Sequence, residues 1–251
     1  MVSKTGTKSV CAYLEWDSNF FGMRIGRIEG RRLSPELLAA TTDWAHENRM
    51  DCLYFLSVAD DPQTVHLAEQ EGFQQVDVRM TFEGEVPGAP VAQAPSDATV
   101  RLAREEDLPA LQAIAAVSHR DTRFYFDGHF DRARCDQLYE TWIANSLHGF
   151  AQAVLVAERG GRPLGYVTLH LRDSESGPES QIGLIAIAPG HQGGGLGRLL
   201  VEHSLEWARG NRARVMKVVT QGRNVPAQRL YQRCGFVTAS FELWYHRWFD
   251  R

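Results

Sequence analysis

Cysteine is scarce in this chain, and its four cysteines lie far apart. They stand at positions 11, 52, 135 and 234, and no two of them form a Cys-x-x-Cys pair. This spacing indicates neither a zinc site nor a redox dithiol. We therefore expect free thiols, as in cytoplasmic proteins, and no bound metal.

Long hydrophobic runs are absent as well. No segment approaches the roughly 18 uninterrupted apolar residues that a membrane span needs. The first 16 residues include lysines but no apolar run, which is unlike a secretory signal. The sequence thus predicts a cytoplasmic protein that has no membrane partner.

Positive charge is not in excess. Lys and Arg number 27 and Asp and Glu number 31, which gives a formal net charge of −4. A nucleic-acid partner is disfavoured, because nothing here makes a broadly basic field. Hydrophobic residues make up 43% of the chain and aromatic residues 10%. A folded core is therefore expected, and disorder over the whole chain is excluded.

Composition divides the chain once. Its 251 residues suit one large domain or two small ones. Residues 83–99 hold three Pro and two Gly and show no hydrophobic periodicity, which is typical of a linker. We expect an N-terminal domain over 1–85, a linker over 86–98 and a C-terminal domain over 99–251.

The expected C-terminal domain mixes strands and helices. Hydrophobic periodicity predicts the elements in turn: strand 100–102, a helix from 105, a helix at 136–149, two strands within 152–173, strand 181–189, helix 197–210, strand 214–220, helix 224–235, and a last strand or hairpin at 237–249. This order predicts a mixed α/β fold. Strand 181–189 is almost wholly apolar, so we expect it to be central.

The two halves of the chain match at a single shift of 163 residues (211 − 48). Trp44-Ala45 then meets Trp207-Ala208, and Gly72-Phe73 meets Gly235-Phe236. Chance matching of common apolar residues is the alternative. A true repeat predicts one helix–strand–helix–strand unit used twice.

The repeat fails at two informative places. Four glycines of the second half correspond in order to Gly30, Arg31, Arg32 and Ser34, and Tyr231 corresponds to Ala68. If both halves share a fold, we expect only the C-terminal one to bind a phosphorylated cofactor.

A glycine-rich loop follows the apolar strand. The strand ends at Pro189, and a loop with five glycines leads into a helix. Glycines let the backbone wrap an anion, and a helix start offers unpaired N–H groups and partial positive charge. The pattern predicts a phosphate cradle, with a flexible turn as the alternative. It is neither a Walker loop nor a dinucleotide fingerprint.

Two segments carry a family resemblance. Residues 192–197 resemble the Q/R-x-x-G-x-G/A motif of the GCN5-related N-acetyltransferase (GNAT) superfamily, and 224–236 resemble its N-x-x-A-x-x-L-Y-x-x-x-G-F segment. The resemblance covers about residues 99–249. It implies a central mixed sheet flanked by helices, and the repeat adds a smaller, degenerate domain of the same kind before it.

The resemblance also implies an acetyl-CoA site and no metal. The pyrophosphate would lie on the backbone of Gln192, Gly193, Gly194, Gly195, Leu196, Gly197 and Arg198. The strand at Ile185, Ala186 and Ile187 would splay from strand 214–220 and pair with the pantetheine arm. Asn224 and Ala227 would contact that arm, and Tyr231 would be the general acid.

Several roles stay open. Asn224 could serve only as a helix cap, and Tyr231 could be a half-buried core residue. The attacking amine needs a base that the sequence does not name. His170 shares a strand face with Tyr166 and Thr168, and His119 and His129 lie in an aromatic loop; a structural or substrate-contacting role is favoured for each. His203 is expected to serve packing.

A narrower resemblance suggests the acceptor. Residues 14–22, L-E-W-D-S-N-F-F-G, are similar to the amino-terminal signature of the TDP-fucosamine acetyltransferase group. The implied substrate is a dTDP-4-amino-4,6-dideoxyhexose. Its phosphates and rings would be bound by Arg120, Arg123, Phe124, Tyr125, His129 and His170. Alternatively, this loop packs its aromatic side chains on the core.

Two rival functions remain. One is a GNAT enzyme (EC 2.3.1.-) for another small or protein amine, and the other is an acyl-CoA-binding module without turnover, which the presence of Tyr231 disfavours. The aromatic last strand could pair across a homodimer or form a buried edge.

Overall fold

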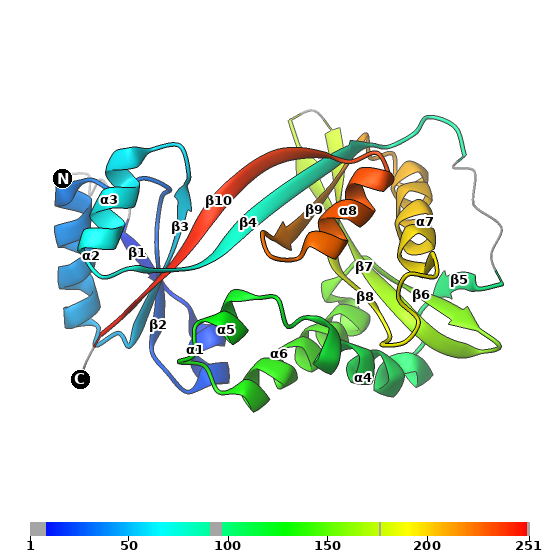
Figure 1. Cartoon of the computed structure of the whole chain (residues 1–251), viewed down its shortest axis with the longest axis horizontal. Coiled ribbons are helices and arrows are strands. Elements are labelled where there is room, and N and C mark those ends of the chain that lie inside the picture. The colour runs from blue at the N-terminus through cyan, green and yellow to red at the C-terminus, as the bar shows by residue number, and fades with distance from the viewer. Residues whose placement is uncertain (1–8, 91–96, 176, 250–251) are drawn as a thin grey trace, which may run out of the picture. The chain divides into compact units, whose positions relative to one another are not determined.

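The structure is a computed structural model that describes residues 9–90, 97–175 and 177–249 (Figure 1). Residues 91–96 of the predicted linker lie outside the described residues. Contacts divide the chain into two compact units. Unit one comprises the chain up to Arg79, Phe126–Phe130 and the chain from Phe241; unit two comprises Met80–Tyr125 and Asp131–Ser240.

Unit one is built on strands in the order β1-β2-β3-β10. Its elements before the first boundary are β1 (Cys11–Tyr13), α1 (Glu15–Phe21), β2 (Ile25–Ile28), α2 (Pro35–Glu47), β3 (Cys52–Val58) and α3 (Pro62–Gln70). Strands β2 and β3 are parallel, and the other two pairs are antiparallel. Leu38 of α2 and Ala68 of α3 pack with Leu53 and Phe55 of β3 to form the core of this unit.

Two long strands have residues in both units: β4 (Gln74–Glu85) and β10 (Val237–Trp248). The last segment is therefore a single strand and not a hairpin. Residues 242–248 of β10 pair with β3 in unit one. In the strand order β10 lies between β3 and β4, so residues 242–248 are not a buried outer edge of the sheet. The division into domains 1–85 and 99–251 stays a prediction.

Unit two is built on strands in the order β9-β8-β7-β6-β5. Its strands are β5 (Thr99–Leu102), β6 (Ala153–Arg159), β7 (Arg162–Ser174), β8 (Gly177–Ile187) and β9 (Val215–Gln221). Its helices are η1 (Glu105–Asp107), α4 (Leu108–Ser118), α5 (Arg123–Phe126, whose last residue belongs to unit one), α6 (Arg132–Asn145), the π-turn η2 (Ser146–Phe150), α7 (Leu196–Gly210) and α8 (Val225–Arg233). Strand β8 lies between β7 and β9, which confirms its predicted central place.

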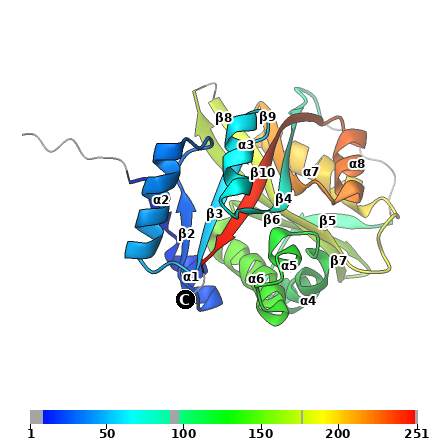
Figure 2. The same cartoon turned by 60° about the vertical axis from the view of Figure 1, so that its left-hand side comes forward.

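Alternation along β7 separates the two faces of this sheet. Val167 and Leu169 face the amphipathic helix α7, where they pack with Leu200 and other buried residues. Tyr166 faces the opposite side and contacts His119, at the end of α4. Helices α4, α5 and α6 gather below the strands in Figure 2. This is the mixed α/β fold that the sequence predicts.

The predicted repeat of elements is confirmed at the shift of 163. Strand β3 corresponds to β9, α3 to α8, and β4 to β10, each with both bounds displaced by 163. Arg49 and Arg212, also 163 apart, are the non-glycine residues with positive φ in the described chain, at 50° and 61°. Helix α7 begins at residue 196, so the shift predicts a start at residue 33 for α2 (196 − 163), but α2 begins at residue 35. The difference lies where the glycine-rich loop has no counterpart in the first half.

Candidate active site

The glycine-rich loop places an open backbone at the start of α7. Gly193 and Gly195 have φ of 77° and 85°, and Gly195 caps the helix in the left-handed region. A Cβ atom on either glycine would meet no atom within 4 Å. The space above this backbone is therefore open, and the first N–H groups of a 15-residue helix point to it.

Gly197 has a different task from the glycines of the loop. A Cβ atom there would lie 3.1 Å from Cδ2 of Leu230. Its missing side chain lets α7 and α8 approach each other. The glycines of the motif thus divide into those that open the loop and one that permits helix packing.

Strands β8 and β9 separate beside this loop. Their parallel pairing runs from Glu179↔Val215 to Ile182↔Val218 and stops there, although β8 continues to Ile187 and β9 to Gln221. On the other side, β8 carries a bulge: Ile182 pairs with Leu169 and Ile185 with Val167. The residues between them are re-aimed, and the edge of β8 at 183–187 is open to an extended ligand. This geometry fits the predicted pantetheine arm.

Helix α8 carries the capping asparagine and the tyrosine. The Asn224 side chain accepts a hydrogen bond from the Ala227 N–H at 3.2 Å, which confirms the cap. Tyr231 is 2% exposed, and its ring lies 5.9 Å from that of Phe82 and 6.1 Å from that of Phe236. Burial raises the pKa of its phenol well above its usual value, so the group is protonated at neutral pH.

Two side chains of the loop motif are bound to the protein itself. Arg198 donates to Glu202 one turn along α7, at 2.6 Å. The Gln192 amide donates to the carbonyl of Ile187 at 3.3 Å. The backbone of the loop, more than these side chains, is what the structure presents to a ligand.

The residues predicted to bind the acceptor belong to both units. In unit two, Arg120 is exposed, and the Arg123 guanidinium lies 4.3 Å from the centre of the Phe124 ring. Phe124 is 2% exposed, as the alternative of a loop packed on the core predicts. Burial and a hydrogen bond to Asp136 raise the pKa of Tyr125.

His129 belongs to unit one. Its Nδ1 lies 2.6 Å from Asp127, and its ring stacks on Trp248 with centroids 4.3 Å apart. Asp127 is buried and is also hydrogen-bonded to His246 and, at 3.0 Å, to the Trp248 indole N–H. These bonds explain why Phe126–Phe130 belongs to unit one, which could not be predicted from the sequence.

The other histidines differ in their surroundings. The ring of His119 stacks on Tyr139, and its Nε2 lies 3.0 Å from the Tyr166 hydroxyl. Burial lowers the pKa of His119 to about 4. His170 lies on the same face of β7 as Thr168: a Cβ atom on Gly183 would meet both side chains.

Sequence reasoning missed Thr168 and Gly183. The Thr168 hydroxyl accepts a hydrogen bond from the Leu184 N–H at 2.8 Å and so fixes the bulge of β8. The available signal was the isolated glycine within an apolar strand, which often marks a bulge or a close approach.

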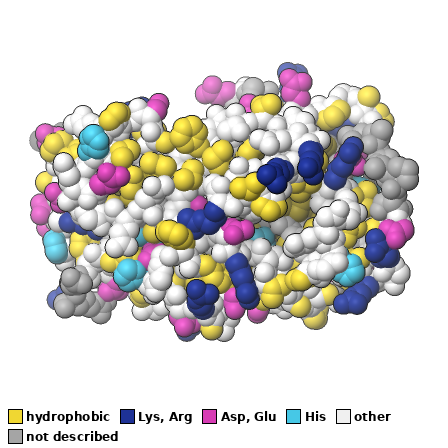
Figure 3. Space-filling model, in the orientation of Figure 1, with side chains coloured by type: hydrophobic (Ala, Val, Ile, Leu, Met, Phe, Trp, Pro, Cys, Tyr) yellow, Lys and Arg dark blue, Asp and Glu magenta, His cyan; other side chains and the backbone are white. Residues whose placement is uncertain are grey.

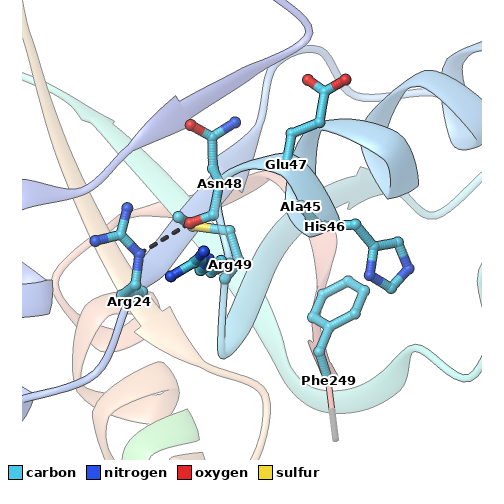
Figure 4. Close-up of a pocket in the computed structure, with 8 residues that line it drawn as sticks. Arg24, Ala45, His46, Glu47, Asn48, Arg49 and Phe249 are labelled. Carbon is cyan, nitrogen blue, oxygen red and sulfur yellow. Dashed lines mark hydrogen bonds between the residues drawn. The ribbon is translucent and has the colours of Figure 1, made fainter. Parts of the chain in front are cut away.

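Surface charge supports an anion site in unit two. Lys and Arg side chains gather over α7 and α8 on the face shown in Figure 3. The exposed arginines there include Arg198, Arg229 and Arg233. A pocket in unit one, lined by Arg24, Asn48 and Phe249 among others, contains none of the predicted site residues (Figure 4).

Neither a metal-binding group nor a membrane-spanning helix occurs in the part of the chain that the structure describes. Within 9–90, 97–175 and 177–249, no group of three His, Cys, Asp or Glu is placed to hold a metal ion. No helix in that same part of the chain is long and apolar enough to cross a membrane.

Known proteins resemble this chain in sequence and in fold. The acetyltransferase (GNAT) family model matches residues 112–236. The dTDP-fucosamine acetyltransferase of Escherichia coli is 28% identical over 93% of this chain and 96% of its own length. The spore coat polysaccharide biosynthesis protein SpsD of Bacillus subtilis is 30% identical over 57% of this chain, which spans only 48% of that protein.

Two further comparisons agree. Phosphinothricin N-acetyltransferase of Alcaligenes faecalis is 32% identical over 61% of this chain and 78% of its own length. The crystal structure of a GCN5-related N-acetyltransferase from Sphaerobacter thermophilus superposes with a TM-score of 0.64 at 15% identity, over 95% of this chain and 76% of that one. The chain therefore belongs to the GCN5-related N-acetyltransferase family and is an acyl-CoA-dependent acetyltransferase.

Proposed function

We propose that this chain transfers an acetyl group from acetyl-CoA to the amine of a nucleotide-linked amino sugar of the dTDP-4-amino-4,6-dideoxyhexose type. The observation that carries the proposal is the similarity to a dTDP-fucosamine acetyltransferase over 93% of this chain, which extends beyond the family segment at 112–236. The similarity of 57% of the chain to a polysaccharide biosynthesis protein supports the same substrate class.

The cofactor is proposed to lie along the opening between β8 and β9. Backbone N–H groups of residues 192–198 bind its pyrophosphate at the start of α7. The open edge of Ile185–Ile187 pairs with the pantetheine arm, and Asn224 adds its amide N–H. When bound, acetyl-CoA supplies the thioester whose carbonyl carbon the amine attacks.

The reaction is proposed to be a direct attack with no covalent enzyme intermediate. A backbone N–H of β8 near Ile185–Ile187 stabilises the oxyanion of the tetrahedral intermediate. The Tyr231 phenol protonates the departing sulfur, because an O–H group on α8 is the proton donor that this segment supplies.

The acceptor is proposed to be an anion with a primary amine. Exposed Arg120 and partly buried Arg123 are suited to bind the two phosphates of a sugar nucleotide. Phe124 packs inward, so we assign it to the core beneath these arginines.

A thiol-release assay with acetyl-CoA tests the acceptor. dTDP-4-amino-4,6-dideoxy-D-galactose is compared with a simple primary amine and with phosphinothricin at equal concentration. We expect kcat/KM for the sugar nucleotide to exceed the others by at least two orders of magnitude. A higher kcat/KM for either of the other amines would show that the proposed acceptor is wrong.

A second candidate is an acetyltransferase for another small amine. The 32% identity to a phosphinothricin N-acetyltransferase favours it. Tight acetyl-CoA binding without transfer to any of these amines would instead support an acyl-CoA-binding module.

A further inference from the structure

His170 lies where β8 leaves β9. On β7 it is the cross-strand partner of Gln181. Its imidazole reaches Gly183, since a Cβ atom on that residue would lie 2.6 Å from Nε2. Gly183 directly follows Ile182, the last residue of β8 that pairs with β9. The Nε2 atom is therefore beside the point at which the two strands separate.

The ring is held in place while its nitrogens remain available. Phe150 of η2 meets it edge-on, with centroids 5.6 Å apart, and Gly183 leaves room on the side of β8. On the side of β6 the neighbouring polar group is Gln152, which accepts from the Leu171 N–H and does not titrate. Among the residues that the structure describes, no group is hydrogen-bonded to either ring nitrogen of His170.

Burial and one neighbouring positive charge favour the neutral form of this imidazole. Partial burial, and then the positive charge of Arg172 on the same strand, lower the pKa of His170 below its usual value. The cross-strand partner of Arg172 is Glu179 of β8, whose carboxylate is bound by Lys217 of β9 at 2.7 Å. At neutral pH one ring nitrogen is thus a free proton acceptor.

We propose that His170 is the general base of the acetyl transfer, and that its Nε2 accepts a proton from the attacking amine. The assignment rests on the proposed function and deepens it. Gly183 serves the same step, because any side chain there would occupy the position of the ring.

The step balances with the groups already named. The neutral amine forms a nitrogen–carbon bond to the thioester carbonyl carbon, and the nitrogen becomes a positively charged, acidic centre. One N–H proton passes to His170 Nε2. The carbon–sulfur bond then breaks, and the electron pair leaves with sulfur, which takes the proton of Tyr231. Proton transfer through water from the imidazolium to the tyrosinate restores both residues.

His119 is less suited to this role. Its Nε2 is bound to the Tyr166 hydroxyl, and its ring is stacked on Tyr139. Tyr166 itself is 0% exposed, so the group that is bound to this Nε2 belongs to the core. His170 combines partial exposure, available nitrogens and a place beside the separating strands.

The experiment compares His170→Gln and His170→Ala with the unmodified protein and with His66→Gln, an exposed histidine of α3 in unit one. Thiol release with dTDP-4-amino-4,6-dideoxy-D-galactose is measured from pH 5 to 9, and acetyl-CoA affinity is measured by calorimetry. We expect kcat to fall by about 10²–10⁴-fold in both His170 variants at unchanged acetyl-CoA affinity. The acid limb of the kcat profile should disappear, and added imidazole should partly restore His170→Ala.

The outcomes separate this assignment from the proposed function. One outcome is that the unmodified protein transfers acetyl to the sugar nucleotide while His170→Gln is equally active at every pH. That result would overturn only the role of His170. Loss of acetyl-CoA binding in both His170 variants would also overturn it, because the residue would then serve the fold of the cofactor site. Absence of transfer by the unmodified protein would remove the proposed function and this base with it.

Discussion

Tyr231 shows how burial sets the chemistry of one side chain. Its ring packs against Phe82 and Phe236, and burial raises the pKa of its phenol. We expect Tyr231→Phe to lower kcat by about 10²–10⁴-fold, with little change in acetyl-CoA affinity because the ring stays in place. Steady-state kinetics and calorimetry check this, with exposed Tyr13→Phe as the control. Unchanged turnover would remove Tyr231 from the mechanism.

Gly195 shows the opposite effect, in which a missing side chain serves the site. Its φ of 85° is strained for any L-residue, and the space beside it is open. We expect Gly195→Val to abolish detectable acetyl-CoA binding, because the side chain fills the phosphate space. Calorimetric titration measures the effect.

The matched control for Gly195→Val is Gly72→Val. Gly72 is exposed, has a positive φ of 76° and would place its Cβ in open space. Normal acetyl-CoA binding by Gly195→Val would count against the phosphate cradle.

At the scale of single residues, the sequence predicts where the glycines and the tyrosine lie better than it predicts the contacts of the other site side chains. The spacing of the glycines reflects the positive φ angles of the loop, which are a local property of the backbone. The ion pair of Arg198 with Glu202 follows the i,i+4 rule and was open to prediction. The inward turn of Phe124 was not, because the choice among neighbouring aromatics depends on tertiary packing.

At the scale of elements, two substitutions at the start of α8 distinguish two roles of Asn224. Its side-chain oxygen caps the helix, and its amide N–H is proposed to contact pantetheine. Asn224→Asp keeps the capping oxygen and removes the amide donor, whereas Asn224→Ala removes both. We expect about 1 kcal/mol loss of unfolding free energy for Ala and little for Asp.

The same two variants should differ from the unmodified protein in cofactor use. We expect the KM for acetyl-CoA to rise several-fold in both. Urea denaturation and thiol-release kinetics measure the two effects. If Asn224→Asp keeps the original KM, Asn224 is a helix cap alone.

Most elements of unit two could be predicted, and the reason is their strong periodicity. Helix α8 begins after Asn224 and ends before Gly235, as its cap and glycine predict. The bulge of β8 and the early end of its pairing with β9 could not be predicted. Both features depend on how β8 pairs with its two neighbours, β7 on one side and β9 on the other. Such a register between strands is not encoded in the local pattern of one strand.

At the scale of the whole molecule, His119 links stability to pH. Burial lowers its pKa from 6.5 to about 4. The unfolded chain then binds the proton more readily, so this contribution to stability is complete above pH 6.5 and is lost as the pH falls toward 4. The loss reaches up to roughly 3 kcal/mol.

We expect His119→Gln to reduce the fall in unfolding free energy between pH 6.5 and 4. Urea denaturation at several pH values checks this, with exposed His66→Gln as the control. Parallel pH dependence in His119→Gln and the unmodified protein would show that His119 does not cause the loss.

The predicted domain boundary rests on composition along the chain, whereas the compact units rest on contacts in space. A Pro- and Gly-rich stretch predicts one boundary, but the compact units are made of several segments each. Composition describes only residues that are close together in the sequence. The buried hydrogen bonds of Asp127, which tie residues 126–130 to Trp248 and His246, connect positions about 120 residues apart.

The pairing of β3 with β10 has a consequence for synthesis of the protein. Val58 lies opposite Glu242, and Cys52 opposite Trp248, so the partners are separated by 184 (242 − 58) to 196 (248 − 52) residues. At translation rates of about 5–20 residues per second, β3 leaves the ribosome roughly 10 to 40 seconds before its neighbour exists. During that interval one edge of a buried, apolar strand has no backbone partner from β10. Unit one is therefore completed only after Trp248 has been synthesised, and removal of residues 242–248 would leave that edge of β3 without its partner.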